Sequence, residues 1–483
     1  MLLSAAILGK PTQANPIGEN GLICRPMQFS QRGWYFFRTY DLLKGMRNGP
    51  ECLQFQPLVH ELRQVFAKAP EWRDTGKIDY PLVDVAVSGL AMMFLQDPGL
   101  LPFQQRLQEK NGSSNLRNFF SVSQVPRETQ FRDLLDSFDF HCLMAGLRRG
   151  ITLLESTRAW LGFRNLDGRF IVALDGTEYF QSEKIHCEHC LERHHKDGRV
   201  EYYHQLLVAA LIHPVTGQAL PMCVEEIRRD DGTTKQDCEI NAASRLLPRL
   251  AKTYCHLDMI IIGDSLYSKT PFMELARSLK LNFILVAQPG DHRHLQEEIA
   301  GIRLAEGITR MEQPGEGKIA NRIYEFAHEV PLFSSTTATA HWVEYSELMT
   351  SGKAGYHNAW VTSLKPTRKN IQPIVATGRH RSSIENQTFN ALKNHGFHFE
   401  HNFGHGKKFL RINFLLLNLL AFMMHQLLSI GDQLYIEAKT WKGSVRQFIE
   451  HIRWATRMVL WPNWTILLNH FLDRGPELRL ESG

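Results

Sequence analysis

The hydrophobic pattern of this chain changes its period near residue 169, and that change constrains the fold more than any other feature. Before it, apolar residues recur at helical spacing, for example in 81–95 and 131–147. After it, short continuous apolar runs alternate with helical patterns. Such runs are typical of buried strands, and we expect them at 169–175, 202–214, 218–227, 259–264 and 282–287. The sequence therefore predicts an α/β fold, a mixed sheet flanked by helices.

The same pattern divides the chain into four parts. A helical region is expected over residues 1–165, followed by the sheet region in 166–289. Short strand-like runs with polar connections then predict a mostly β insertion over 290–365, after which helices of the sheet region resume over 366–430. A further helical region is expected over 431–483. The insertion is thus expected to interrupt the alternation of strands and helices.

The composition is typical of a globular protein from a reducing compartment. Of 483 residues, 43% are hydrophobic and 22% are charged, and the eight cysteines are too few and too unevenly spaced for a disulfide scaffold. The most apolar stretch, 409–428, is interrupted by Asn413, Asn418 and His425, which favours a buried core helix over a membrane span. The apolar stretch in the first ten residues has no basic residue before it. We therefore expect a cytoplasmic protein with no membrane partner.

Positive charge is concentrated in one segment. The whole chain has a formal net charge of +5, whereas residues 365–411 contain nine Lys or Arg and two acids, which leaves +7. Because a basic segment neutralises phosphates and releases counterions, it is typical of proteins that bind nucleic acid. A solvated, charge-rich helical face is the alternative interpretation.

Three acidic residues stand where carboxylates can meet. Asp175 and Asp264 each end an expected strand, and Glu385 lies in the first turn of a helix expected to begin at 382. Carboxylates at the ends of adjacent strands converge on one crevice. Two of them, with a glutamate from a helix, suit a pair of Mg²⁺ ions about 3.5 to 4 Å apart, which is an arrangement that supports in-line phosphoryl displacement.

Two of these acids also have a purely structural interpretation. Asp175 and Gly176 together are typical of a two-residue hairpin turn. Glu385 fits a capping box in which Ser382 is the N-cap. Asp264 is left without a capping role, because the helix that follows it has a better N-cap later in the chain.

Three sequence blocks around these acids resemble the catalytic blocks of bacterial insertion-sequence DDE transposases. They are LDGTEYFQS (174–182), IIIGDSLYS (260–268) and RSSIENQTFNALKNHGFHFEHNFGHG (381–406). The order of strand-Asp, strand-Asp, insertion and helix-Glu matches as well, and the resemblance covers roughly 165–430. It implies an RNase-H-like catalytic core, formed by 166–289 and 366–430, with a β insertion before the catalytic glutamate.

The resemblance implies that Asp175, Asp264 and Glu385 form a catalytic triad that binds Mg²⁺ or Mn²⁺. The protein would be a DNA transposase that cuts the ends of an insertion sequence and joins their 3′-hydroxyls to target DNA by two-metal phosphoryl transfer. Residues 1–165 would bind the terminal inverted repeats, and two protomers would form a homodimer on DNA. Two alternatives stay open: an RNase-H-like metallonuclease without strand transfer, and an inactive DNA-binding regulator derived from a transposase.

Basic residues near the third acid are candidates for DNA contact. Related families have a Tyr-x2-Arg-x3-Glu-x6-Lys pattern, of which Arg381-x3-Glu385 fits. The Tyr position holds a glycine and the Lys position a leucine, with Lys393 one residue later. Further candidates lie in the polar loop 398–408, for which a hydrogen-bonded connection between two helices is the alternative. The four candidates are Arg381, Lys393, Lys407 and Lys408.

A second candidate metal site is the segment IHCEHCLERHH, residues 185–195. Cys187-x2-Cys190 is the spacing that lets two thiolates bind one tetrahedral Zn²⁺, and His194 or His195 is the expected third ligand. A pair of reduced cysteines in a loop is the alternative, and a redox pair fits less well because the motif does not open a helix after a strand. The fourth zinc ligand is left open among a more distant residue and His186, His189 and His204.

Overall fold

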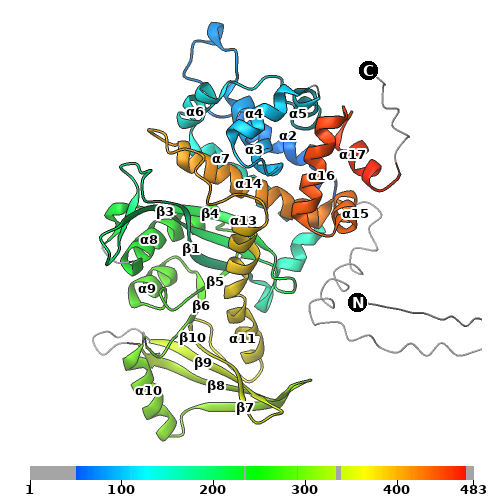
Figure 1. The fold of residues 1–483 in the computed structure, drawn as a ribbon. Helices are drawn as coiled ribbons and strands as arrows, with labels where there is room; N and C mark the ends of the chain where they lie inside the picture. The colour runs from blue at the N-terminus through cyan, green and yellow to red at the C-terminus, as the bar shows by residue number, and fades with distance from the viewer. Residues whose placement is uncertain (1–49, 110, 233–234, 291, 333–338, 475–483) are drawn as a thin grey trace, which may run out of the picture. The chain divides into compact units, whose positions relative to one another are not determined.

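A mixed sheet runs through the computed structural model, which describes residues 50–109, 111–232, 235–290, 292–332 and 339–474 (Figure 1). Within these residues the ten strands follow the order β2-β3-β1-β5-β6-β10-β9-β8-β7, with β4 paired to β3. The α/β class expected from the sequence is confirmed. The strands are β1 (Phe170–Ser182), β2 (Leu191–His194), β3 (Val200–Ile212), β4 (Ala219–Ile227), β5 (Met259–Gly263), β6 (Asn282–Val286), β7 (Thr309–Pro314), β8 (Ile319–Pro331), β9 (Thr339–Met349) and β10 (Ala354–Thr362).

Helices precede, follow and interrupt these strands. Before the sheet come α2 (Phe55–Phe66), α3 (Leu82–Phe94), α4 (Leu100–Gln108), α5 (Gly112–Phe120), α6 (Glu128–Asp136) and α7 (Phe140–Glu155). Between strands lie α8 (Lys235–Thr253), α9 (Thr270–Ser278) and α10 (Arg293–Leu304). After the sheet come α11 (Ile371–Arg379), α12 (Arg381–Ser383), the π-helix η6 (Ile384–Phe389), α13 (Asn390–Asn394), α14 (Leu410–Gly431), α15 (Gln433–Lys442), α16 (Val445–Met458) and α17 (Trp464–Phe471). Single 3-10 turns are η1 (Glu51–Leu53), η2 (Thr75–Lys77), η3 (Arg158–Phe163), η4 (Leu166–Gly168) and η5 (Arg229–Asp231).

Four of the six strands between 170 and 286, namely β3 to β6, lie where the hydrophobic pattern predicts them, whereas β1 starts as expected but continues past its expected end at 175 to Ser182. β1, β3 and β4 pair antiparallel in succession, and β1, β5 and β6 pair in parallel. β5 has the sequence MIIIG and is buried along its whole length. A continuous apolar run of this kind is expected where helices cover both faces of a sheet. The short strand β2 was not expected, because its sequence LERH is polar and it pairs only with the first residues of β3.

Helices cover the two faces of the sheet at β1. Successive side chains of a strand point to opposite faces. The Asp175 carboxylate faces Arg381 of α12, whereas a side chain at Gly176 would meet Glu239 of α8 within 3 Å. α8 and α12 therefore lie on opposite faces of β1.

The segment expected as a β insertion extends the same sheet. β10 pairs antiparallel with β6, with Trp360 opposite Val286, and β9, β8 and β7 follow outward. Trp360 in β10 and Trp342 in the neighbouring β9 are both fully buried. The helix α10, which was not expected, packs against β8. The insertion is therefore joined to the sheet by main-chain hydrogen bonds between β10 and β6.

The helices before and after the sheet form one shared core. The ring of Phe55 in α2 stacks on Trp464 of α17 with centroids 4.1 Å apart. Asn115 of α5 donates to the carbonyls of Thr456 and Val459 at 2.7 and 2.8 Å and accepts from the Trp461 N–H at 2.8 Å. The described residues all belong to one compact unit, so the boundaries expected at 165 and 430 fall inside it. Residues 1–49 of the expected N-terminal region lie outside the described residues.

Helix α14 is the central element of this core. Within the described residues it alone is long and apolar enough to span a membrane, and 83% of its most apolar window is buried inside the protein. The side-chain N–H groups of its asparagines have partners there: Asn413 donates to the Leu135 carbonyl at 2.7 Å, and Asn418 donates to the Phe397 carbonyl at 2.7 Å. The imidazole of His425 contacts the Tyr435 hydroxyl at 2.7 Å. These bonds agree with the expected buried core helix, because buried polar groups need partners.

The N-terminus of α14 is held by an aspartate from another helix. The carboxylate of Asp136, at the end of α6, accepts hydrogen bonds from the backbone N–H groups of residues 407 to 410 at 2.9 to 3.0 Å. A helix leaves its first N–H groups without intrahelical partners, so this carboxylate acts as a cap supplied from outside. Burial raises the pKa of Asp136, but the four donors outweigh it and hold the pKa below its ordinary value of 3.8.

We predict that Asp136→Ala lowers the free energy of unfolding by about 1 to 2 kcal/mol, because four N–H donors lose their acceptor. Asp133→Ala, at an exposed position of the same helix, is the matched control and should change little. Because the folded-state pKa of Asp136 is lowered, its contribution is complete above the unfolded value and is lost as the pH falls through the folded value. Urea unfolding at pH 7 measures the difference, and equal stabilities of the two variants would contradict the cap.

Candidate active site

The pairing of β1 with β5 places the two candidate aspartates side by side. The paired register of these parallel strands ends with Ala173 opposite Ile262. Asp175 and Asp264 each stand two residues further on, so the same register carries both to one edge of the sheet. Asp175 lies within β1, opposite Val208 of β3, so the hairpin turn considered for it is wrong. Asp264 follows β5, and its carboxylate accepts from the Leu266 N–H at 3.0 Å.

Glu385 lies in an unusual stretch of helix. The chain is helical almost without a break from Ile371 to Asn394, and residues 384–389 within it form the π-helix η6. Ser382 is therefore inside the helical run and makes no N-terminal cap, so the capping box expected for Glu385 is wrong. π-helical turns in α-helices occur frequently at functional sites, because they re-aim the side chains that they carry.

Arg381 joins the three carboxylates. Its Nη2 atom lies 3.7 Å from Oδ2 of Asp175 and 3.8 Å from Oδ2 of Asp264, and its Nη1 atom lies 3.4 Å from Oε2 of Glu385. One guanidinium thus contacts all three of the acids that the sequence singles out. The three acids differ in burial: the exposed fraction of the side chain is 14% at Asp175, 37% at Asp264 and 60% at Glu385.

The acids open onto a cavity of about 640 Å³. Arg381 and Lys393 line it together with the three acids, so basic groups face the space that the acids border. Lys393 also forms an ion pair with Glu400 at 3.0 Å. The expected basic contacts Lys407 and Lys408 are exposed and do not line this cavity.

A fourth carboxylate, Glu239 of α8, also lines the cavity and was missed by sequence reasoning. It is 4% exposed, accepts a hydrogen bond from Gln205 Nε2 at 2.8 Å and accepts one from the Tyr267 hydroxyl at 3.3 Å. A signal for it exists in the sequence. Glu239 precedes Ala242, Ala243 and Leu246 by three, four and seven residues, which places an acid on the apolar face of an amphipathic helix.

The pKa of Asp175 is raised from 3.8 to about 7. Burial is the largest cause, because it disfavours the ionised form; Arg381 acts in the opposite direction, and the nearby charges of Asp264, Glu239 and Glu385 add to the increase. A strongly raised carboxyl pKa in a cleft, with named charge partners, is characteristic of functional sites.

Comparison with known proteins returned no match: no family model fits the chain, and no curated protein is significantly similar to it.

The donor set of this cavity fits divalent cations with a preference for oxygen. Mg²⁺ and Mn²⁺ bind carboxylates, and clustered negative charge that is costly without a cation becomes favourable beside one. Asp175, Asp264 and Glu385 are the residues that would hold the ions. Arg381 supplies positive charge at the same place in the metal-free protein.

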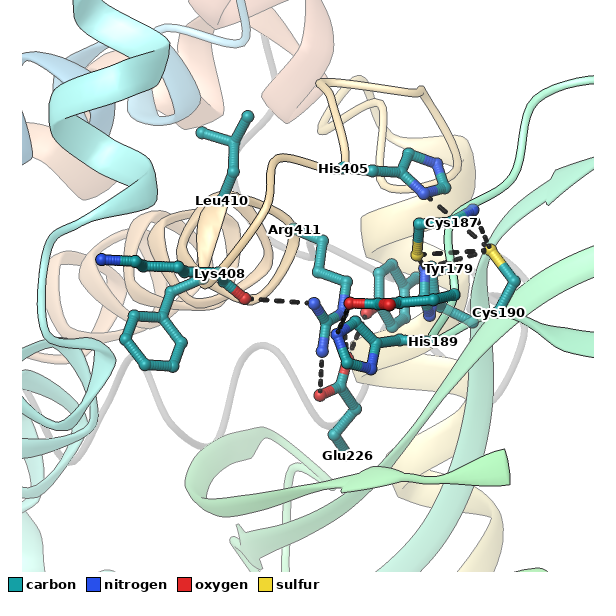
Figure 2. A network of polar contacts seen from close by, with 12 residues as sticks. Tyr179, Cys187, His189, Cys190, Glu226, His405, Lys408, Leu410 and Arg411 are labelled. Carbon is teal, nitrogen blue, oxygen red and sulfur yellow. Dashed lines mark hydrogen bonds and ion pairs between the residues drawn. The ribbon is translucent and has the colours of Figure 1, made fainter. Parts of the chain in front are cut away.

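The cysteines and histidines of 185–195 are arranged differently from the expectation. Cys187 and Cys190 lie together as expected, but His194 and His195 turn to Glu192 and Glu201, at 3.3 and 3.5 Å. The reason is the strand β2, whose pairing with β3 fixes the backbone of Leu191–His194 and directs these rings away from the thiols. His204 contacts both thiols instead, and His405 contacts the Cys190 thiol (Figure 2 shows His405 and the two cysteines).

We predict that Asp175→Asn stabilises the metal-free protein at pH 8 by on the order of 2 kcal/mol, because it removes a buried charge. Between the unfolded pKa of 3.8 and the folded pKa of about 7, the unfolded state loses the proton that the folded state keeps. The unmodified protein therefore loses stability as the pH rises through this window, and the advantage of the variant grows until about pH 7.

Thermal unfolding in EDTA from pH 5 to 8 measures this difference. Added Mg²⁺ should stabilise the unmodified protein more than the variant. A variant that is less stable than the unmodified protein at pH 8 in EDTA would contradict the electrostatic cost assigned to Asp175.

Proposed function

We propose that the protein is a DNA transposase of the DDE type. It cuts DNA at the ends of an insertion sequence and joins the 3′-hydroxyls to target DNA. Both steps are in-line attacks of an oxygen on phosphorus, so one carboxylate site serves for water and for the 3′-hydroxyl. No covalent intermediate between protein and DNA is required.

The observation that carries the proposal is the contact of one guanidinium with three acids from distant parts of the chain. Asp175 and Asp264 are 89 residues apart, and Glu385 follows after another 121. Their convergence in one cavity supports the triad that the resemblance implies. Had the carboxyl group of Glu385 been remote from the other two, the proposal would have no chemical basis.

The sheet supports the same proposal. The first aspartate lies in β1, the second follows the parallel neighbour β5, and the strands β7 to β10 come before the helix that carries the glutamate. This is the order that an RNase-H-like core with a β insertion requires. We therefore propose an RNase-H-like core for residues 166–289 and 366–430, extended at the edge of β6 by the insertion.

Each residue of the site has a role in this proposal. When bound, two Mg²⁺ ions would activate the attacking oxygen and stabilise the leaving one. Asp175, Asp264 and Glu385 would hold the ions, and the deep position of Asp175 would make its carboxylate the most desolvated ligand. Arg381 and Lys393 face the same cavity, where they would bind the phosphates that flank the scissile bond.

Lys407 and Lys408 would contact DNA further from the reacting phosphate. Their side chains are exposed, while their backbone N–H groups are held by the carboxylate of Asp136. Because their backbone is already fixed, binding of a phosphate chain would order only the two side chains. The proposed partners are the terminal inverted repeats and target DNA, bound by a homodimer.

We predict that alanine at Asp175, Asp264 or Glu385 reduces cleavage of DNA carrying the element ends by more than about 100-fold, because a metal ligand is lost. Affinity for the same DNA, measured by fluorescence anisotropy in EDTA, should change less than about threefold. Glu274→Ala, at an exposed position on α9 outside the cavity, is the matched control and should cleave normally.

Pre-cut ends with 3′-hydroxyls, incubated with a supercoiled plasmid and Mg²⁺ or Mn²⁺, distinguish the alternatives. Joined products support the transposase, and hydrolysis without joining supports the metallonuclease. An unmodified protein that binds the ends but neither cuts nor joins them in either metal would support the inactive regulator. Normal cleavage by Asp264→Ala would contradict the site itself.

A further inference from the structure

Four metal-binding side chains from distant parts of the sequence meet near the carboxyl end of β1 and the start of β3, and Figure 2 shows three of them, Cys187, Cys190 and His405. Their ligand atoms all lie within 4.8 Å of one another. Two thiols come from the segment after β1, one imidazole from β3, and one imidazole from the loop before α14. We name this group the Cys/His cluster; its members are Cys187, Cys190, His204 and His405.

Four of the distances between ligand atoms in the Cys/His cluster are close to those of a tetrahedral zinc centre. Bonds of about 2.3 Å to sulfur and about 2.05 Å to nitrogen place two sulfurs about 3.8 Å apart, and a sulfur and a nitrogen about 3.6 Å apart. The two sulfurs are 3.7 Å apart. His204 Nε2 lies 3.5 and 3.4 Å from the two sulfurs, and His405 Nδ1 lies 3.9 Å from Cys190.

The backbone and the neighbouring rings hold these ligands in place. The Cys190 N–H donates to the Cys187 carbonyl at 3.1 Å, which closes the turn between the two thiols. His204 is 1% exposed and stacks on Tyr179, with ring centroids 5.5 Å apart. The ring of His405 packs edge-on against Phe180 at 4.3 Å. The ligands are thus ordered by their surroundings, because groups packed against metal ligands fix the orientation of those ligands.

The charge of the Cys/His cluster also suits Zn²⁺. Binding releases two thiol protons, and the two thiolates then balance the charge of the ion, so a neutral buried site results. Arg411, a cation that acts on the Cys190 thiol, is already paired: its guanidinium donates to both oxygens of Glu226, at 2.8 and 3.1 Å (Figure 2). A disulfide between the thiols would engage neither imidazole, whereas a metal engages all four groups.

We propose that the Cys/His cluster is a structural Zn²⁺ site that fastens the loop before α14 to the sheet. The loop 395–409 joins the helix that carries Glu385 to α14. The Asp136 carboxylate binds the backbone N–H groups at the end of this loop, and His405 would attach the loop to the sheet through the ion. Four protein ligands complete the tetrahedron, so the site is closed and has no catalytic position. The proposal concerns folding and is independent of the proposed DNA chemistry.

The test begins with metal analysis of the full-length protein purified without chelator. We expect inductively coupled plasma mass spectrometry to find one zinc per chain. Cys190→Ser, His204→Ala and His405→Ala should each reduce the zinc content to less than half and lower the thermal midpoint by about 5 °C or more. The matched controls are His194→Ala and His195→Ala, which should keep their zinc. Asp264→Ala should keep its zinc as well. Loss of zinc from Asp264→Ala would place the ion in the carboxylate cavity and overturn the proposal.

A second measurement covers the case in which the variants fail to fold. In the unmodified protein, Co²⁺ exchanged for zinc should give the visible absorption of a tetrahedral centre and a thiolate-to-cobalt charge-transfer band. Stripping the metal should lower the thermal midpoint, and added zinc should restore it. Absence of zinc after reconstitution, a cobalt spectrum without the thiolate band, or equal loss of zinc from His194→Ala and His405→Ala would each overturn the proposal. DNA cleavage is measured separately, so its failure leaves this result unaffected.

Discussion

Repulsion among carboxylates that share one cavity is the interaction on which the candidate site depends. Asp175, Asp264, Glu385 and Glu239 all border the same space, and the neighbouring charges add to the burial that raises the pKa of Asp175 to about 7. Arg381 offsets part of this cost from the centre of the group. Clustered carboxylates destabilise the metal-free fold, and the same cluster attracts a bound cation. A functional site of this kind therefore lowers the stability of the fold that carries it.

The fold supplies the rigid elements that hold these charges together. Hydrogen-bonded pairing of β1 with β5 fixes the two aspartates at one sheet edge, and the π-helical turn directs Glu385 to the same place. Helix α8 brings Glu239 from the opposite face of β1. Because the acids repel one another, only a scaffold stabilised elsewhere can keep them close, and the apolar strands and helices beneath them provide that stability.

The connection between the glutamate helix and α14 links the sheet to the helical core. Asp136 caps the start of α14 from α6, and His405 in the same loop contacts the thiols beside β3. Buried Asn413 and Asn418 tie α14 to the segments around it. A loop attached on both sides loses little further backbone entropy on binding a ligand, so the backbone that carries its exposed lysines is ordered in advance.

Local patterns in the sequence determined much of this protein. Alternation of apolar runs and helical periods located β1, β3 to β6 and α14, because burial of side chains follows the period of the backbone. The sequence also singled out Asp175, Asp264 and Glu385 as candidates. They stand at the ends of expected elements, and the blocks around them resemble those of a known family. Their meeting in one cavity agrees with that prediction.

Only the tertiary structure decided which distant side chains share a site. His204 and His405, rather than His194 and His195, join Cys187 and Cys190, because pairing of β2 with β3 turns the nearer histidines away. Glu239 enters the acidic cavity from α8, and the helix of Glu385 begins at Ile371 instead of 382. Sequence spacing records position along the chain, whereas contacts between elements depend on strand register and helix packing, which arise only when the chain is folded.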